Sequence, residues 1–131
     1  MIMNGKYLLD TNTVISFMRK DEETVEAIHE LEEVFIPVTV VGELYYGAFK
    51  SKKIKENLKN LSELLKIISV LGNDVETARI YGDLKNKLKE KGRPIPENDI
   101  WIASIAKQYK LTIMTADQHF EAIENLKLVV P

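Results

Sequence analysis

Residues 6–18 have the sequence KYLLDTNTVISFM, which is typical of the first unit of a parallel α/β fold. Lys6 to Leu9 form a short apolar run that predicts a buried strand, and this run ends at Asp10. Thr13 to Met18 then predict a short helix, which one of residues 10–12 can cap through its side chain. A strand that leads directly into a helix is the repeating unit of a sheet with helices packed on its faces.

The same alternation continues along the chain. Further strands are predicted at Val34–Ile36, Ile67–Leu71, Thr112–Met114 and Leu126–Val130. Further helices are predicted at Glu22–Leu31, Thr39–Phe49 (with Thr39 as N-cap), Ser51–Lys66, Asp74–Lys91, Glu97–Tyr109 and Phe120–Ile123. The longest of these should end at Gly92, and its apolar face should consist of Val75, Ala78, Tyr81, Leu84 and Leu88. The pattern predicts an α/β fold with three layers, α/β/α, around a mostly parallel sheet.

Length and composition limit the class of protein. The chain has 131 residues, of which 45% are hydrophobic and 29% charged, and it contains no cysteine. This length suits one domain, so we expect residues 1–131 to form a single unit. The absence of cysteine excludes disulfides, thiolate zinc sites and cysteine nucleophiles. No apolar run approaches the roughly 20 residues of a membrane span, and residues 1–10 lack the features of a secretory leader, so we expect a cytoplasmic protein.

Charge is distributed unevenly, although the net charge is only −2. Lys20 to Glu33 contain one lysine and seven acids, whereas Lys50 to Lys66 contain six lysines and two glutamates. Lys85 to Arg93 form a second basic run, with five cations and one glutamate. Such runs occur on ordinary solvated helix faces, and they also form the local basic surfaces that bind phosphate chains.

Four acidic residues occupy similar places relative to the predicted strands and helices. Asp10 directly follows the first strand, and Asp117 lies just past the strand Thr112–Met114. Glu43 lies early in the helix after the second strand, and Asp99 lies in the first turn of the helix that follows Pro96. Functional residues of open α/β sheets gather at the carboxyl ends of the strands, so four acids far apart in sequence can meet in one crevice.

A cluster of carboxylates is unfavourable unless a cation neutralises it, because each charge raises the pKa of its neighbours. Mg²⁺ and Mn²⁺ fit a site built from oxygen ligands, and such an ion activates water and stabilises charge on phosphorus oxygens. The simpler alternative for Asp10, Asp99 and Asp117 is helix capping, a common role of aspartate at a strand-to-helix turn. Capping does not explain Glu43, which lies in a largely apolar stretch and needs a polar partner.

Four motifs carry a resemblance to a known family. They are LLDTN at residues 8–12, GELYYG at residues 42–47, NDIWIA at residues 98–103 and TADQHF at residues 115–120. In order, spacing and chain length they resemble PIN-domain ribonucleases, and most of all the VapC toxins of prokaryotic toxin–antitoxin pairs. The resemblance covers essentially the whole chain.

The resemblance implies a set of site residues by matching motif positions. The catalytic acids would be Asp10, Glu43, Asp99 and Asp117, and the metal ligands would be Asp10, Asp99 and Asp117. The supporting polar residues would be Thr11, Asn12 and Thr115. His119 has no consistent catalytic role in the family, so packing or hydrogen bonding to the following loop is expected for it. Base stacking or packing is open for Trp101, Tyr45 and Tyr46, with packing expected for at least one of the tyrosines.

The resemblance also implies a reaction and partners. The chain would be an endoribonuclease that hydrolyses RNA phosphodiester bonds with Mg²⁺ or Mn²⁺. It would form a homodimer and act as the toxin of a type II toxin–antitoxin system, blocked by an antitoxin that is encoded alongside it. VapC-type toxins cut structured RNAs, often transfer or ribosomal RNA.

Three alternatives remain open at the level of sequence. The first is a PIN nuclease that matures RNA without an antitoxin. The second is a PIN-like module that binds RNA without cutting it, although the intact acids argue against this. The third is a haloacid-dehalogenase-type phosphatase, which uses Asp-x-Asp after its first strand. Here Asn12 occupies the second of these positions, and Glu43 has no role in that scheme.

Positive charge must lie beside such a site, because four carboxylates repel the phosphate chain that they cut. The lysine-rich run directly follows the helix of Glu43, and a single arginine precedes the helix of Asp99 in the same way. We therefore predict phosphate contacts from Lys50, Lys52, Lys53 and Arg93.

Overall fold

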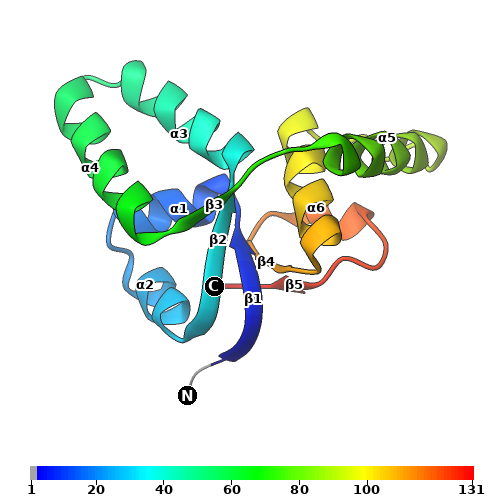
Figure 1. Cartoon of the computed structure of the whole chain (residues 1–131), viewed down its shortest axis with the longest axis horizontal. Helices are drawn as coiled ribbons and strands as arrows, with labels where there is room; N and C mark the ends of the chain where they lie inside the picture. Colours follow the sequence, from blue (N-terminus) through cyan, green and yellow to red (C-terminus); the bar gives the residue numbers. More distant parts are fainter. Residues whose placement is uncertain (1–2) are drawn as a thin grey trace.

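The computed structural model describes residues 3–131, which form a five-stranded sheet surrounded by helices (Figure 1). The strands are β1 (Met3–Leu9), β2 (Leu31–Pro37), β3 (Ser69–Leu71), β4 (Thr112–Met114) and β5 (Leu128–Val129). Their order across the sheet is β3-β2-β1-β4-β5, and every pair of neighbours is parallel. The predicted α/β fold is confirmed, and the sheet of the described residues is wholly parallel.

Helices connect these strands, as parallel pairing requires. They are α1 (Thr11–Met18), α2 (Glu22–His29), α3 (Val38–Phe49), α4 (Ile54–Ile67), α5 (Val75–Glu90), α6 (Glu97–Tyr109) and the 3-10 helix η1 (Gln118–Ala122). In Figure 1, α1–α4 gather on the side of β2 and β3, and α5 and α6 lie on the side of β4 and β5. None of the helices formed by residues 3–131 is long and apolar enough to cross a membrane.

The central strand β1 fixes where a site can form. The chain first builds β2 and β3 on one side of β1, and later adds β4 and β5 on the other side. The loops that leave β1 and β4 therefore diverge, and this opens a crevice at the carboxyl ends of the two strands. Leu8 and Leu9 of β1 and Ile113 and Met114 of β4 are fully buried, so the crevice rests on a rigid core.

The start of α3 differs from the prediction. The helix begins at Val38, and its N-cap is Pro37, which makes no side-chain capping bond. Pro37 has the extended backbone of a cap residue, with φ −76° and ψ 152°, and it also ends β2. Thr39 therefore lies inside the helix, and its predicted role as N-cap is wrong.

The helix predicted from Ser51 begins only at Ile54. Ser51 instead closes the turn between α3 and α4. Its hydroxyl donates to the carbonyl of Ala48 at 2.7 Å and accepts from the side-chain amide of Asn57 at 2.8 Å. These two bonds hold α3 and α4 as a helical hairpin.

The buried face of α5 also differs from the predicted one. Val75 is 86% exposed and Ala78 is exposed, whereas Thr77 is fully buried. Thr77 and Asp74 form a reciprocal capping box, and the Thr77 hydroxyl also contacts the Gln108 side chain of α6. The polar cap thus turns Thr77 toward α6, and the apolar stripe begins one turn later than the periodicity suggested.

The other elements agree with the prediction apart from their ends. The helix α6 and the strand β4 lie at the predicted positions. Gly92 follows α5 with a φ of +67°, as expected for a glycine that ends a helix. The strand β1 begins earlier, β2 begins at Leu31 where the helix α2 was expected to end, and β3 and β5 are shorter. A 3-10 helix at Gln118–Ala122 replaces the predicted helix Phe120–Ile123.

Candidate active site

The four predicted acids lie at the carboxyl-end side of the sheet. Asp10 follows β1 directly and Asp117 follows β4, and these two strands are hydrogen-bonded neighbours. Glu43 lies in α3, which begins directly after β2, and Asp99 lies in the first turn of α6. Three of the four acids line one open hollow of about 360 Å³, whose walls are Glu43, Pro96, Glu97, Asn98, Asp99, Asp117 and His119.

Asp10 is buried beside this hollow rather than lining it, with 4% of its surface exposed. Its Oδ1 accepts from the backbone N–H of Thr13 at 3.0 Å, which caps α1. Its Oδ2 accepts from the hydroxyl of Thr115 at 2.5 Å. Asp10 therefore serves as a helix cap and also faces the segment that carries Asp117.

Thr115 links the two sides of the site. Its buried hydroxyl donates to Asp10 and accepts from the backbone N–H of Asp117 at 2.9 Å. Close by, the hydroxyl of Thr13 donates to the carbonyl of Met114 at 3.0 Å and ties α1 to the end of β4. These bonds fix the loop after β4 against the start of α1, and they set the position of Asp117 relative to Asp10.

Glu43 has the polar partner that its apolar surroundings required. The hydroxyl of Thr11 donates to Glu43 Oε1 at 2.8 Å, and the carboxylate is half-buried. Thr11 follows Asp10 directly, so the same short segment carries the buried carboxylate of Asp10 and also holds the carboxylate of Glu43 on α3. Asn12, the third predicted polar residue of this segment, is exposed and lines an adjoining hollow together with Asp117.

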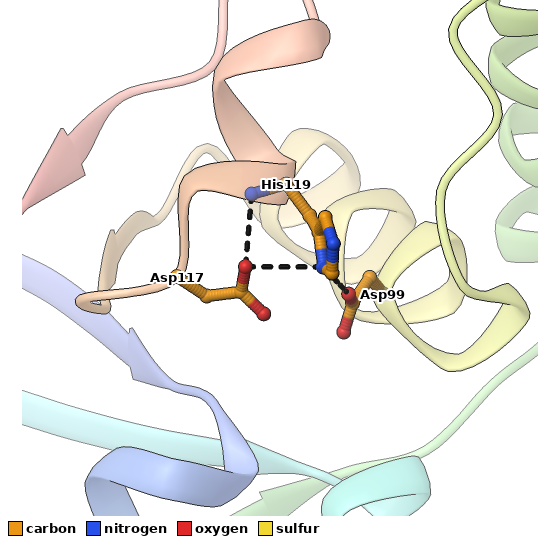
Figure 2. Close-up of side chains that lie close together, drawn as sticks. All are labelled: Asp99, Asp117 and His119. Atoms are coloured by element: carbon orange, nitrogen blue, oxygen red, sulfur yellow. Dashed lines mark hydrogen bonds and ion pairs between the residues drawn. The ribbon is translucent and has the colours of Figure 1, made fainter.

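A histidine lies between two of the acids, as Figure 2 shows. His119 Nδ1 is 3.2 Å from Asp99 Oδ2 and 3.1 Å from Asp117 Oδ1. The backbone N–H of His119 also donates to Asp117 Oδ1 at 2.8 Å, which caps η1. His119 therefore contacts the acids themselves, and the expectation that it would bond to the following loop is wrong. The reason is that η1 turns the ring toward α6, and sequence spacing alone does not reveal this turn.

Asp99 is the most perturbed acid of the site. Its pKa rises from the ordinary value of 3.8 to about 6, mainly because the carboxyl is buried and also because Asp117 lies close to it. Glu43 raises the pKa of Asp99 further, while His119 opposes the shift. A carboxyl crowded in this way binds a proton readily, and a divalent cation would relieve the same repulsion.

The capping alternative explains part of the site. Asp10 caps α1 and Asp117 caps η1, but each carboxylate has two oxygens and contacts further groups. Asp99 caps nothing, since the N-cap of α6 is Pro96 and no side-chain bond is made there. Capping therefore leaves the position of Asp99 beside Asp117 unexplained.

One group of side chains has the spacing of a metal site. Ligand atoms of Asp99, Asp117 and His119 all lie within 4.8 Å of one another. Two of the three donors are carboxylate oxygens, which suit Mg²⁺ or Mn²⁺, and the third is an imidazole nitrogen. The donor set fits a divalent cation.

The predicted phosphate contacts lie outside the walls of this hollow, which include none of Lys50, Lys52, Lys53 and Arg93. The ammonium of Lys50 is 4.6 Å from the ring centroid of Tyr46, and Lys53 pairs with Glu56 at 3.9 Å.

Two other cations are linked to residues of the site, and sequence reasoning did not single them out. Arg19 lines a second hollow of about 340 Å³ between α1, α3 and α4, which Glu43 also lines. Within residues 3–131, Arg19 has no ion-pair partner. Lys85 pairs with Glu97, which lines the acidic hollow.

The aromatic residues of the motifs divide between packing and exposure. Trp101 of α6 stacks on Tyr81 of α5, with ring centroids 3.9 Å apart, so this face of the indole is covered. Tyr45 is 36% exposed and stacks on Phe49, and Tyr46 is 66% exposed. Neither tyrosine is part of the core of the described residues.

Comparisons with known proteins agree with the fold and with the motifs. Residues 7–126 match the PIN domain family. Ribonuclease VapC2 of Rickettsia felis is 32% identical over 127 residues, which is 93% of this chain and 95% of the relative. The tRNA(fMet)-specific endonuclease VapC of Shigella flexneri is 30% identical over 125 residues, or 93% of this chain and 95% of the relative.

A solved structure shows the same architecture. The crystal structure of VapBC2 from Rickettsia felis, bound to a DNA fragment from the promoter, superimposes with a TM-score of 0.90 at 28% sequence identity. The match covers 97% of this chain and 99% of the other chain. The chain therefore belongs to the VapC family of PIN-domain ribonucleases, the toxins of type II toxin–antitoxin systems.

Proposed function

We propose that this chain is an endoribonuclease that hydrolyses phosphodiester bonds in the hollow of Glu43, Asp99 and Asp117, with Mg²⁺ or Mn²⁺ as its cofactor. The observation that carries this proposal is the gathering of acids on one side of the sheet, where burial, together with the nearby charge of Asp117, raises the pKa of Asp99 to about 6. Membership of the VapC family removes the phosphatase alternative, and the four intact acids support cleavage rather than RNA binding alone.

The residues of the site have separate tasks in this proposal. Asp99 and Asp117 would hold the ion together with Asp10, which lies on the buried side and is joined to Asp117 through Thr115. When bound, the ion would activate water and stabilise the charge on the phosphorus oxygens. The hydroxyl of Thr11 donates to Glu43 Oε1, whereas Oε2 makes no hydrogen bond within residues 3–131. In this proposal Glu43 Oε2 would accept the proton of the attacking water.

Relatives support a class of substrate and a partner. One relative is named a tRNA(fMet)-specific endonuclease, and we propose a structured RNA, with transfer RNA as the first candidate. The matched Rickettsia felis chain is part of a toxin–antitoxin complex, and we propose that a cognate antitoxin blocks this site by bringing a basic side chain to the acids. We further propose that the chain acts in the cytoplasm as a homodimer.

Removal of divalent metal tests the cofactor. Cleavage of a transfer RNA pool by the purified chain is expected to stop in EDTA and to return when Mg²⁺ or Mn²⁺ is added in excess, because the acids repel the substrate without a cation. Gel analysis of the RNA measures the result, and Glu43→Gln should remain inactive after metal is restored. Cleavage that continues in EDTA would contradict the proposed use of metal.

Salt dependence tests the predicted phosphate contacts. Each contact that Lys52→Ala, Lys53→Ala or Arg93→Ala removes should lower the slope of log affinity against log salt by about 0.7 on single strands. We expect the same for Arg19→Ala, because Arg19 lines the hollow beside Glu43 and makes no ion pair with another of residues 3–131. Fluorescence anisotropy with a labelled RNA measures the slopes, and Lys89→Ala is the control. Unchanged slopes in all four variants would mean that these charges are only solvated surface.

A further inference from the structure

His119 is placed at the two acids by the backbone as well as by its ring. Asp117 caps η1, and it accepts from the backbone N–H of His119 at 2.8 Å. This bond fixes the start of the side chain beside Asp117, and Nδ1 then comes within 3.1 Å of Asp117 Oδ1 and 3.2 Å of Asp99 Oδ2 (Figure 2). The ring therefore occupies the space that the two carboxylates face.

We propose that His119 is a direct ligand of the divalent cation through Nδ1, and that this nitrogen makes the site favour Mn²⁺ over Mg²⁺. The inference rests on the proposed metal site and adds a residue and a selectivity to it. It is consistent with the position of His119 in a motif, TADQHF, in which only the aspartate and the threonine had an expected role in the site.

The distances support a shared ion. Neighbouring ligands of an octahedral ion with bonds of about 2.1 Å lie about 3 Å apart. Nδ1 lies 3.1 and 3.2 Å from one oxygen of each carboxylate, which matches this spacing. The same distances also suit an N–H group of the ring that donates to both acids, so ligation and simple hydrogen bonding are the two roles to separate.

Exposure favours ligation. The side chain of His119 is 53% exposed, whereas those of Asp99 and Asp117 are 16% and 24% exposed. The ring is therefore open to an ion that enters the hollow, while the two carboxylates lie deeper. For ligation the proton of the neutral imidazole must sit on Nε2, which leaves the lone pair of Nδ1 for the ion.

A nitrogen ligand changes which ion the site prefers. Mg²⁺ favours oxygen ligands and loses its water reluctantly, whereas first-row transition ions accept imidazole nitrogen. A site with carboxylates alone would lack this discrimination. The loss of His119 should therefore weaken binding of Mn²⁺ much more than binding of Mg²⁺.

The chain contains only two histidines, so a single control variant accounts for the other imidazole. The other is His29, an exposed residue of α2 whose ring lies edge-on to Phe17 with centroids 6.4 Å apart. His29→Gln is therefore a matched control that removes an imidazole elsewhere on the chain. His119→Asn is the test variant, since its amide can still donate a hydrogen bond near the position of Nδ1 but is not an imidazole ligand.

Pulsed EPR of Mn²⁺ bound to the full chain, with histidine labelled by ¹⁵N, reports nitrogen ligation directly. We expect coupling to one imidazole nitrogen in the unmodified chain and in His29→Gln, and no such coupling in His119→Asn. Calorimetric titration should show Mn²⁺ affinity reduced at least about tenfold in His119→Asn, with Mg²⁺ affinity changed by less than about threefold. Circular dichroism checks that the variant is folded.

Three results would overturn the inference, two of them without touching the proposed metal site. Bound Mn²⁺ without nitrogen coupling, or equal losses of Mn²⁺ and Mg²⁺ affinity in His119→Asn, would show that His119 only donates hydrogen bonds, and the proposed metal site would stand. Failure of the unmodified chain to bind Mn²⁺ at all would overturn the metal site together with this inference.

Discussion

Replacement of Asp99 by asparagine is expected to abolish RNA cleavage and, in the absence of metal, to make the protein more stable. The cleavage rate should fall by about a thousandfold or more, because a bound ion contributes several kcal/mol of charge stabilisation in the transition state. A substitution that destroys activity by unfolding the chain would lower its stability, so the opposite signs of the two effects identify a site residue. RNA cleavage with excess Mg²⁺ measures the first effect.

The expected gain in stability follows from the pKa of Asp99. In the folded protein this pKa is about 6, above the ordinary value of 3.8, so between these two values the folded state binds more protons than the unfolded state. The free energy of unfolding therefore falls as pH rises from about 4 to about 6, and the penalty is complete above that range. The shift corresponds to about 3 kcal/mol at most. Asparagine carries no charge and escapes this penalty.

Urea unfolding in EDTA at about pH 8 and at about pH 4 measures the difference. Asp99→Asn should be more stable than the unmodified chain at the higher pH, and the gain should disappear at the lower pH. Asp83→Asn is the control, since Asp83 is an exposed residue of α5 that pairs with Lys87 at the surface. It should change stability by less than about 1 kcal/mol. A loss of stability in Asp99→Asn at about pH 8 would contradict the penalty that burial and neighbouring charge place on the ionised Asp99.

Replacement of Thr115 by valine should cause the second large effect, in this case a loss. The hydroxyl of Thr115 is buried, and it satisfies a carboxylate oxygen of Asp10 and the backbone N–H of Asp117 together. Valine has nearly the same shape but leaves both groups without this partner. Unpaired buried groups of this kind cost about 1–3 kcal/mol each, and more when one of them is charged, so we expect a loss of about 2–4 kcal/mol.

Chemical denaturation of the metal-free protein measures this loss, and Thr115→Ser provides the matched control. Serine keeps the hydroxyl, so Thr115→Ser should retain most of the stability and most of the affinity for metal. Thr115→Val should also weaken metal binding by about 10–100-fold, as the loss of groups that orient metal ligands commonly does. A stability of Thr115→Val within about 0.5 kcal/mol of that of the unmodified chain would show that the bridge contributes nothing.

Local sequence signals predicted most of the fold. Pro96 cannot continue a preceding helix, so a new helix starts after it. The apolar run after Asp99 favours a buried helix. These two signals predict the helix Glu97–Tyr109 with its observed ends. Predictions failed where a contact between distant segments decides the outcome. Thr77 is buried because it meets Gln108 of α6, and the exposure of Val75 follows from this contact rather than from helical periodicity.

The same distinction holds for the site. That the acids lie on one side of the sheet could be predicted, because the carboxyl ends of parallel strands share one edge. How deeply each acid is buried could not be predicted. Asp10 is buried, whereas Glu43, Asp99 and Asp117 line the hollow. The contact of His119 with Asp99 also lay beyond prediction, since it depends on the 3-10 turn after β4 and on the placement of α6 beside it.

The pairing of β1 with β4 makes the candidate site depend on two segments that the ribosome makes at different times. The Thr115–Asp10 hydrogen bond joins residues that are 105 positions apart, and β4 leaves the ribosome after α1–α4. A nascent chain that has already folded α1–α4 still lacks Asp117 and the loop that places it. The growing polypeptide therefore lacks a complete candidate site until β4 and the loop after it have been added.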